Sequence, residues 1–166
     1  GGAYIDATYF SCSGGRTEDA LAVWGVEIPY LQSVESPGED GAENYRHTVT
    51  FSGWEFQRKL ERTLSGPPAS WLGAVTYTKG GGVATMIIGG KTYTGTQLRQ
   101  LLGLNSMAFT MEATGDGIRV ITSGKGHRVG MSQEGAEVMA VTGSTWQEIL
   151  THYYRGIRID KLTDIG

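Results

Sequence analysis

The pattern of apolar and polar residues along the chain predicts many short strands separated by turns. Two-residue alternation, and runs of β-branched and aromatic residues, are typical of strands. Such segments cover residues 4–10, 28–34, 47–51, 71–78, 83–88, 107–113 and 118–122. The glycine-rich turns at 79–82 and 114–117 predict hairpins between neighbouring strands. The polar segment 36–44 is expected to be a solvent-facing loop.

Four other segments have the spacing of amphipathic helices. In the first of them Phe56 and Leu60 lie four residues apart on one face, and Ser52 precedes them as a cap. In the last of them Thr145 and Glu148 have the spacing of a capping box. The predicted helices cover residues 52–64, 96–102, 132–141 and 146–153.

Together these segments predict a single mixed α+β domain, with mainly antiparallel strands and three or four short helices. A chain of 166 residues is long enough for one hydrophobic core. A strand-like segment begins already at Tyr4, without a start methionine or a polar tail before it. We therefore expect residues 1–166 to be an incomplete part of a longer protein.

Composition excludes several classes of protein. Glycine occupies 26 of the 166 positions, but there is no Gly-X-Y period and 10% of residues are aromatic, which excludes collagen and disordered chains. A net charge of −3 offers no basic field for a phosphate backbone, so we expect no nucleic-acid partner. No stretch approaches the ~18 apolar residues of a membrane span, so no anchor is expected in this chain. Cys12 is alone and cannot form an internal disulfide.

Two glycine-rich loops that follow predicted strands contain the residues best suited to proton transfer. The loop 11–18 ends at Glu18, and the loop 124–133 contains His127, a residue type that titrates near neutral pH. A loop glutamate more often caps a neighbouring amide, and a loop histidine more often makes a structural hydrogen bond, so both readings stay open. The histidines are scattered and Cys12 has no evident co-ligands, so we expect no metal and no cofactor.

The second loop and the segment after it resemble a known family. The run GKGHRVGMSQEGAEVMAVTGSTWQEILTHYYRG, at 124–156, resembles the C-terminal signature of the stage II sporulation protein D family, also called the amidase-enhancer family. The run FSCSGGRTED, at 10–19, resembles the family's Ser-Gly-Gly-x-Thr-Glu motif, and TGTQLRQLLGLNSMAF, at 94–109, fits its pattern before the hairpin. The chain is thus identified as the C-terminal part of such a domain.

The resemblance implies an extracytoplasmic protein, associated with the cell wall or membrane, that remodels peptidoglycan during sporulation. The family's activity is that of a lytic transglycosylase. A carboxylic acid protonates the glycosidic oxygen, and the C6 hydroxyl of the muramyl sugar closes on its own anomeric carbon to give a 1,6-anhydro end. The family's catalytic glutamate is attributed to a segment upstream of the first motif, which would lie outside this chain. Whether the chain itself is an enzyme therefore stays open.

Carried onto this sequence, the family motifs predict site residues in both loops. Glu18 and His127 are expected to support catalysis or to act as acid or base. Glycan contacts are expected from Tyr9, Ser11, Ser13, Thr17, Ser132, Gln133 and Tyr154. For Tyr154, packing in the core and stacking on a sugar stay open as alternatives. Two positions depart from the family pattern, because Lys125 stands where an aromatic residue is usual and Arg128 replaces a glycine. Arg128 must adopt a negative φ, with the loop reshaped around His127, or accept strain.

Two functions remain open from the sequence. The first is cleavage of glycan strands, active only with the upstream half of the protein. The second is a non-catalytic glycan-binding module that enhances a peptidoglycan amidase. The expected partners are peptidoglycan glycan strands, a cell-wall amidase of the sporulation machinery and the chain's own missing N-terminal half.

Overall fold

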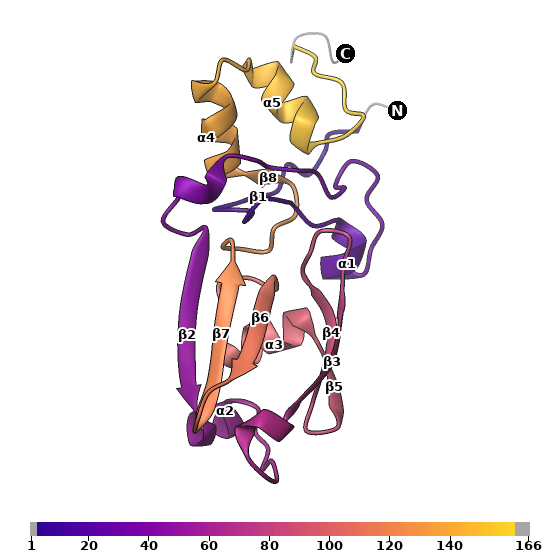
Figure 1. Ribbon diagram of the computed structural model, residues 1–166. Coiled ribbons are helices and arrows are strands. Elements are labelled where there is room, and N and C mark those ends of the chain that lie inside the picture. The colour runs from indigo at the N-terminus through magenta and orange to yellow at the C-terminus, as the bar shows by residue number, and fades with distance from the viewer. Residues whose placement is uncertain (1–2, 162–166) are drawn as a thin grey trace.

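A computed structural model of the chain describes residues 3–161. Two small sheets lie at one end and two helices at the other, with a zone of loops between them (Figure 1). The described residues form five α-helices, and their sheets are antiparallel apart from one short parallel pair. This confirms the predicted α+β class. The sequence predicts three or four helices, and the one that it does not predict is α1 (Ala20–Trp24).

The first sheet has the strand order β2-β7-β6. β2 (Arg46–Ser52) and β6 (Phe109–Ala113) both pair antiparallel with β7 (Gly117–Ser123). The amide of Thr114 donates to the carbonyl of Gly117 over 2.8 Å and closes the turn between β6 and β7. The hairpin predicted at 114–117 is therefore confirmed.

The second sheet has the strand order β3-β4-β5. β3 (Leu72–Tyr77) and β4 (Val83–Ile88) form the hairpin predicted around 79–82. β5 (Lys91–Thr94) follows β4 after a two-residue turn and pairs with it antiparallel. This third strand was not predicted, because its four residues are too few to show an alternating pattern.

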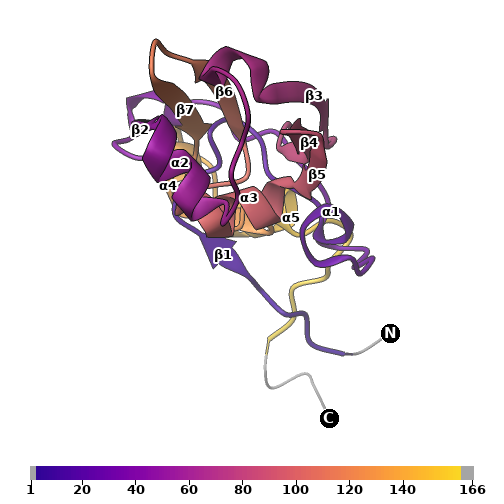
Figure 2. The ribbon, with the colours of Figure 1, turned by 90° about the horizontal axis from the view of Figure 1, so that it is seen from below.

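Helices α2 (Gly53–Lys59) and α3 (Gly95–Leu102) lie along the same side of the two sheets (Figure 2). Each begins with a capping box, Ser52 with Glu55 and Thr94 with Gln97. α2 ends before the predicted Leu64, because the chain turns into the left-handed region at Glu61, with a φ of 53°. A short 3-10 helix, η2 (Pro68–Ser70), follows before β3.

One hydrophobic core fills the space between the two sheets, α2 and α3. Phe56 of α2 stacks on Trp71 with ring centroids 6.2 Å apart, and Leu60 and Leu64 are buried beside them. The four-residue spacing thus identified the buried side chains correctly, although the helix itself is shorter.

A second, smaller core lies under α4 (Gln133–Val141) and α5 (Trp146–Tyr153). Ser132 caps α4, and Thr145 forms a capping box with Glu148 at the start of α5, as predicted. Between the two cores, β1 (Tyr9–Phe10) pairs in parallel with β8 (Met131–Ser132).

Of two further predicted strands, one is much shorter than predicted and the other is absent. Of the segment 4–10 only Tyr9 and Phe10 form a strand, since only these residues meet a partner, in β8. The segment 28–34 forms no strand, because its carbonyls accept hydrogen bonds from a loop and a helix start rather than from a ladder. The acceptors are Val34 and Leu31, and the donors are the amides of Thr17 and Ala20.

The segment 36–44 also differs from its prediction as a solvent-facing loop. It contains a 3-10 helix, η1 (Glu39–Gly41), and both Ser36 and Glu39 are buried. Across residues 3–161, no helix has both the length and the apolar character needed to cross a membrane.

Candidate functional site

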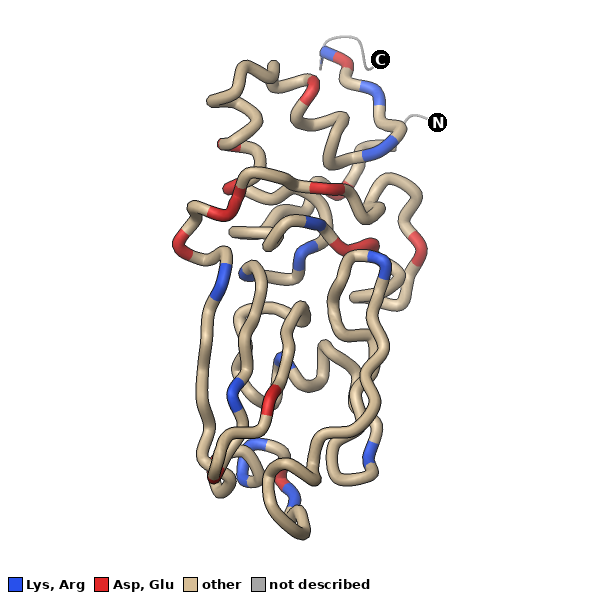
Figure 3. The backbone as a smooth tube through the Cα atoms, viewed as in Figure 1, with Lys and Arg blue, Asp and Glu red and all other residues tan. Residues whose placement is uncertain are grey.

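The two predicted loops lie side by side in the middle of the molecule, where acidic and basic positions also gather (Figure 3). Backbone bridges connect them, Cys12 with Lys125 and Glu18 with Val129. The amide of Lys125 donates to the carbonyl of Cys12 over 2.8 Å, and the amide of Glu18 donates to the carbonyl of Arg128 over 2.6 Å. The structure therefore joins segments that are far apart in the sequence into one unit.

Arg128 lies at the centre of this unit. Its φ of 65° lies in the left-handed region, which strains any residue other than glycine. Of the two predicted alternatives, Arg128 therefore accepts strain rather than a negative φ. Its Nε donates to the carbonyl of Ser13 over 2.7 Å. Its Nη2 donates to the carbonyls of Arg16 and Gly80, over 2.6 and 3.0 Å. Arg128 therefore ties the first loop to the β3–β4 turn.

Glu18 is fully buried and forms an ion pair with Arg128. Its Oε1 accepts from Arg128 Nη1 over 3.1 Å, from the Thr78 hydroxyl over 2.8 Å and from the Gly82 amide over 2.8 Å. Its Oε2 has no hydrogen-bond partner within the described part of the chain. A side chain at Gly82 would collide with this carboxylate. Glu18 therefore locks the loop onto the β3–β4 turn and has no direct access to solvent.

A second buried carboxylate, Glu39, holds the same loop from the opposite side. It accepts hydrogen bonds from the Ser13 amide over 2.7 Å, from the Ser13 hydroxyl over 2.9 Å and from the Gly14 amide over 3.2 Å. The hydroxyl of Ser36 and the thiol of Cys12 donate to it as well. Burial raises the pKa of Glu39, but these hydrogen bonds outweigh burial and leave it below its usual value.

The groups around Glu39 are held in their protonated forms. Burial and the hydrogen bond to Glu39 raise the pKa of the Cys12 thiol to about 12. Burial also raises the pKa of Tyr153, to about 12, and its hydroxyl lies 2.6 Å from that of Ser36. The cluster therefore holds a single anion, surrounded by donors.

His127 lies at the outer edge of the loops. Its ring centroid is 5.4 Å from that of Trp24 and 5.7 Å from that of Phe10. The amide of Val129 donates to Nδ1, which leaves the ring proton on Nε2. Burial and the nearby charge of Arg99 lower the pKa of His127, so the ring is neutral at pH 7. A neutral, half-buried imidazole that touches an exposed indole is suited to contact a ligand.

The surface beside His127 carries exposed aromatic and apolar residues. Tyr9 is 61% exposed and Trp24 is 41% exposed. α1, which ends at Trp24, also forms one wall of a pocket of about 330 Å³. That pocket is lined by Leu21 and Ala22 of α1 and by its N-cap Asp19, together with Thr78, Lys79, Ala84, Thr94, Gly95, Thr96 and Met107. The polar groups beside it include Asp19, a carboxylate that is partly accessible.

The other predicted contact residues divide into buried and accessible ones. Gln133 is exposed and Ser11 is half-buried. Ser13, Thr17 and Ser132 are buried and hydrogen-bonded within the protein. Tyr154 packs in the second core and donates its hydroxyl to the carbonyl of Thr8 over 2.7 Å, so the structure favours the core alternative for this residue.

Three residues of this region were not predicted from the sequence. Asp19 follows Glu18 directly, but its accessibility depends on the start of α1, where it caps the helix. Trp24 could have been recognised as an exposed aromatic residue only once α1 was known. The sequence predicts Glu39 in a solvent-facing loop, since all its donors except Ser36 come from a segment distant in the sequence. Within residues 3–161, no three His, Cys, Asp or Glu side chains are grouped so as to hold a metal ion.

Comparison with known proteins finds clear relatives, although no family model matches the chain. The chain is 47% identical over 158 residues to stage II sporulation protein D of Bacillus subtilis and 44% identical over 158 residues to the protein of that name from Bacillus amyloliquefaciens. These matches cover 95% of the chain, and 46% and 45% of the relatives. An uncharacterized protein of Brachyspira hyodysenteriae is 34% identical over 160 residues, which are 93% of the chain and 43% of that protein. The chain spans about half the length of the curated relatives it matches.

Proposed function

Since the chain belongs to the stage II sporulation protein D family along 95% of its length, we propose that it remodels cell-wall peptidoglycan during sporulation. Within that role, the two joined loops form the glycan-contacting side of a site of the lytic transglycosylase type. The observation that carries this proposal is the exposed indole of Trp24 against the half-buried imidazole of His127, next to the loops that the buried Glu18–Arg128 pair holds together.

The aromatic surface has the chemistry that sugars require. Sugar rings present C–H groups on their faces, which pack against aromatic rings, while their hydroxyls seek hydrogen-bond partners. Trp24 and Tyr9 offer the first kind of contact, and Gln133, Ser11 and the polar rim of the neighbouring pocket offer the second.

Glu18 has a positioning role in this proposal. A general acid must come within hydrogen-bond distance of the oxygen that it protonates. Glu18 is fully buried and engaged by Arg128, Thr78 and Gly82, so it acts by fixing the loop rather than by touching the glycan. The carboxylic acid that protonates the glycosidic oxygen is supplied from outside residues 1–166. The C6 hydroxyl of the muramyl sugar then displaces the leaving sugar at its own anomeric carbon, gives its proton to the carboxylate that remains, and leaves a 1,6-anhydro end.

A second candidate function is a non-catalytic glycan-binding module that enhances a peptidoglycan amidase. The burial of Glu18 favours it, because the two loops then recognise glycan without contributing an acid of their own. Both functions act on the cell wall, and we propose an extracytoplasmic location for the protein in either case.

Binding is tested with the 166-residue chain and glycan strands freed of stem peptides. Trp24→Ala should abolish retention of the chain by the strands, and Trp24→Phe should keep part of it. Trp146→Ala is the matched control, because Trp146 is 58% exposed but belongs to α5. Equal retention of Trp24→Ala and the unaltered chain would refute the proposed surface.

Cleavage is tested with a form of the protein that also carries the additional length present in the relatives. Incubation with the same strands should release anhydro-muramyl ends, detected by mass spectrometry. If no such ends form, but a peptidoglycan amidase becomes faster when the protein is added, the second function replaces the first. Failure of both assays would refute the role in peptidoglycan remodelling.

A further inference from the structure

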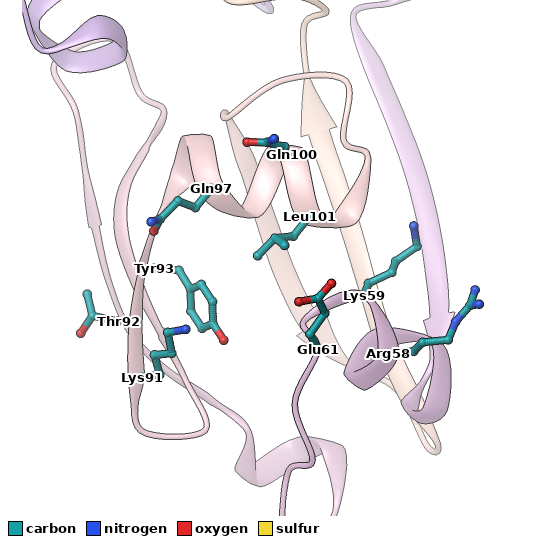
Figure 4. A pocket seen from close by; sticks show the side chains of 9 residues that line it. All are labelled: Arg58, Lys59, Glu61, Lys91, Thr92, Tyr93, Gln97, Gln100 and Leu101. Atoms are coloured by element: carbon teal, nitrogen blue, oxygen red, sulfur yellow. The ribbon is translucent and has the colours of Figure 1, made fainter.

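A pocket of about 680 Å³ lies between α2, β5 and α3, elements at the sheet end of the molecule in Figure 1, and its lining side chains are shown in Figure 4. Lys91 and Thr92 of β5 lie on one side of it, Arg58 and Lys59 of α2 on the other (Figure 4). Glu61, Tyr93, Gln97, Gln100 and Leu101 complete the lining. The proposed glycan-contacting function uses none of these residues.

The three basic side chains of this pocket are oriented by aromatic rings rather than by carboxylates. The Lys91 ammonium lies 4.8 Å from the ring centroid of Tyr93, and that of Lys59 lies 5.5 Å from the centroid of Phe51. The Arg58 guanidinium lies 4.9 Å from the ring of Trp54. Among residues 3–161 none of the three forms an ion pair. Their positive charges are therefore held in place but not neutralised.

A second observation points to a ligand. Tyr93 is 3% exposed, and its hydroxyl has no hydrogen-bond partner within the described residues. The ring extends from β5 toward the space between the two sides of the pocket (Figure 4). A buried hydroxyl without a partner loses about 1–3 kcal/mol of hydration, which a ligand that hydrogen-bonds it would restore.

The distribution of charge identifies the class of ligand. Cations at both sides of the pocket fit a ligand with two separate carboxylates. Glu61 lies between them and disfavours a compact dianion such as phosphate. Gln100 offers an amide of the kind that pairs with peptide groups, and Gln97, whose Oε1 caps α3, offers its NH₂ group. We propose that this pocket binds an acidic peptide segment that carries two carboxylates.

The experiment uses the 166-residue chain and isothermal titration with three probes. Acetyl-Gly-Glu carries two carboxylates and should bind. Its diamide, acetyl-Gly-Gln-amide, has the same length without the charges and should not bind. Inorganic phosphate should bind more weakly than acetyl-Gly-Glu. Binding of the diamide as tight as that of the dicarboxylate, or tighter binding of phosphate, would overturn the assignment.

Three variants locate the binding. Lys91→Ala and Arg58→Ala should each raise the dissociation constant of acetyl-Gly-Glu by about tenfold, since each removes one charge-assisted contact. Tyr93→Phe should lower the affinity for acetyl-Gly-Glu without lowering the thermal unfolding midpoint, because the hydroxyl has no partner to lose in the free protein. Arg119→Ala removes an exposed cation of β7, outside the pocket, and should leave binding unchanged. Unchanged affinity in Lys91→Ala and Arg58→Ala would refute the proposal.

Discussion

The guanidinium of Arg128 donates to the carboxylate of Glu18 over 3.1 Å, with the two side chains 2% and 0% exposed. The same guanidinium holds the carbonyls of Ser13 and Arg16, so one side chain fixes both the charge and the backbone of the first loop. A buried ion pair contributes little compared with well-packed apolar residues, but the loss of one partner leaves an uncompensated charge. The pair is therefore more important for the shape of the loop than for the total stability of the fold.

Arg128→Met should destabilise the chain by about 3–5 kcal/mol, because Glu18 is left buried without its cation. Urea denaturation measures the change. The double variant Glu18→Gln with Arg128→Met should lose less free energy of unfolding than the sum of the losses in the two single variants. Arg119→Ala, which removes an exposed ion pair with Glu112, is the control and should change stability by less than about 1 kcal/mol. Strict additivity in the double variant would contradict the coupling.

Gly82→Ala should destabilise the chain by about 1–3 kcal/mol, because the added methyl group collides with the Glu18 carboxylate and the side chain of Met107. Thermal unfolding measures the loss. Gly115→Ala is the control, since an added methyl group there meets open space. If both variants unfold at the same temperature, the carboxylate is not pressed against the β3–β4 turn.

Stability should decrease in acid through Glu39. The pKa of this carboxyl is lowered on folding, so its ionised form stabilises the chain fully above the unfolded value of about 4.3. That contribution is lost as the pH falls through the folded-state pKa. The urea midpoint of the unaltered chain should therefore fall more between pH 6 and pH 3 than that of Glu39→Gln. Glu43→Gln, an exposed acid of the same segment, should retain the full decrease; an equally steep profile in Glu39→Gln would exclude Glu39 as its source.

Cys12 should resist alkylation in the folded chain. With a pKa of about 12, the thiol is almost entirely protonated at pH 8, and only the thiolate reacts. Iodoacetamide labelling followed by mass spectrometry should be slow for the native chain and fast in urea. Rapid labelling under native conditions would show that the Glu39 cluster is open to solvent.

Local signals made much of the fold predictable. The cap Ser52 and the capping box of Thr145 with Glu148 both form as expected, and Glu55 completes a second box with Ser52. The hairpin at 114–117 is likewise specified by its own turn. These features depend only on neighbouring residues, so a single sequence contains the information needed to find them.

The rest of the fold and the site depend on segments that meet only after folding. The run 28–34 has the composition of a strand, yet Leu31 and Val34 are apolar because they fill the second core. Glu39 resembles any loop acid until Ser13 and Ser36 surround it. The sequence predicts a possible backbone strain at Arg128, but not that its side chain holds the loop. The spacing of apolar residues along the sequence does not indicate contacts between such distant segments.

The pairing of β1 with β8 has a consequence for the order in which the protein forms. Thr8 and Ser13 receive their hydrogen bonds from Tyr154 and Arg128, near the other end of the described chain. Contacts of such long sequence separation are slow to form, because a large loop must close first. During synthesis the first loop therefore has none of these partners until the C-terminal helices have left the ribosome. The surface that we propose to contact glycan is expected to be the last part of the molecule to mature.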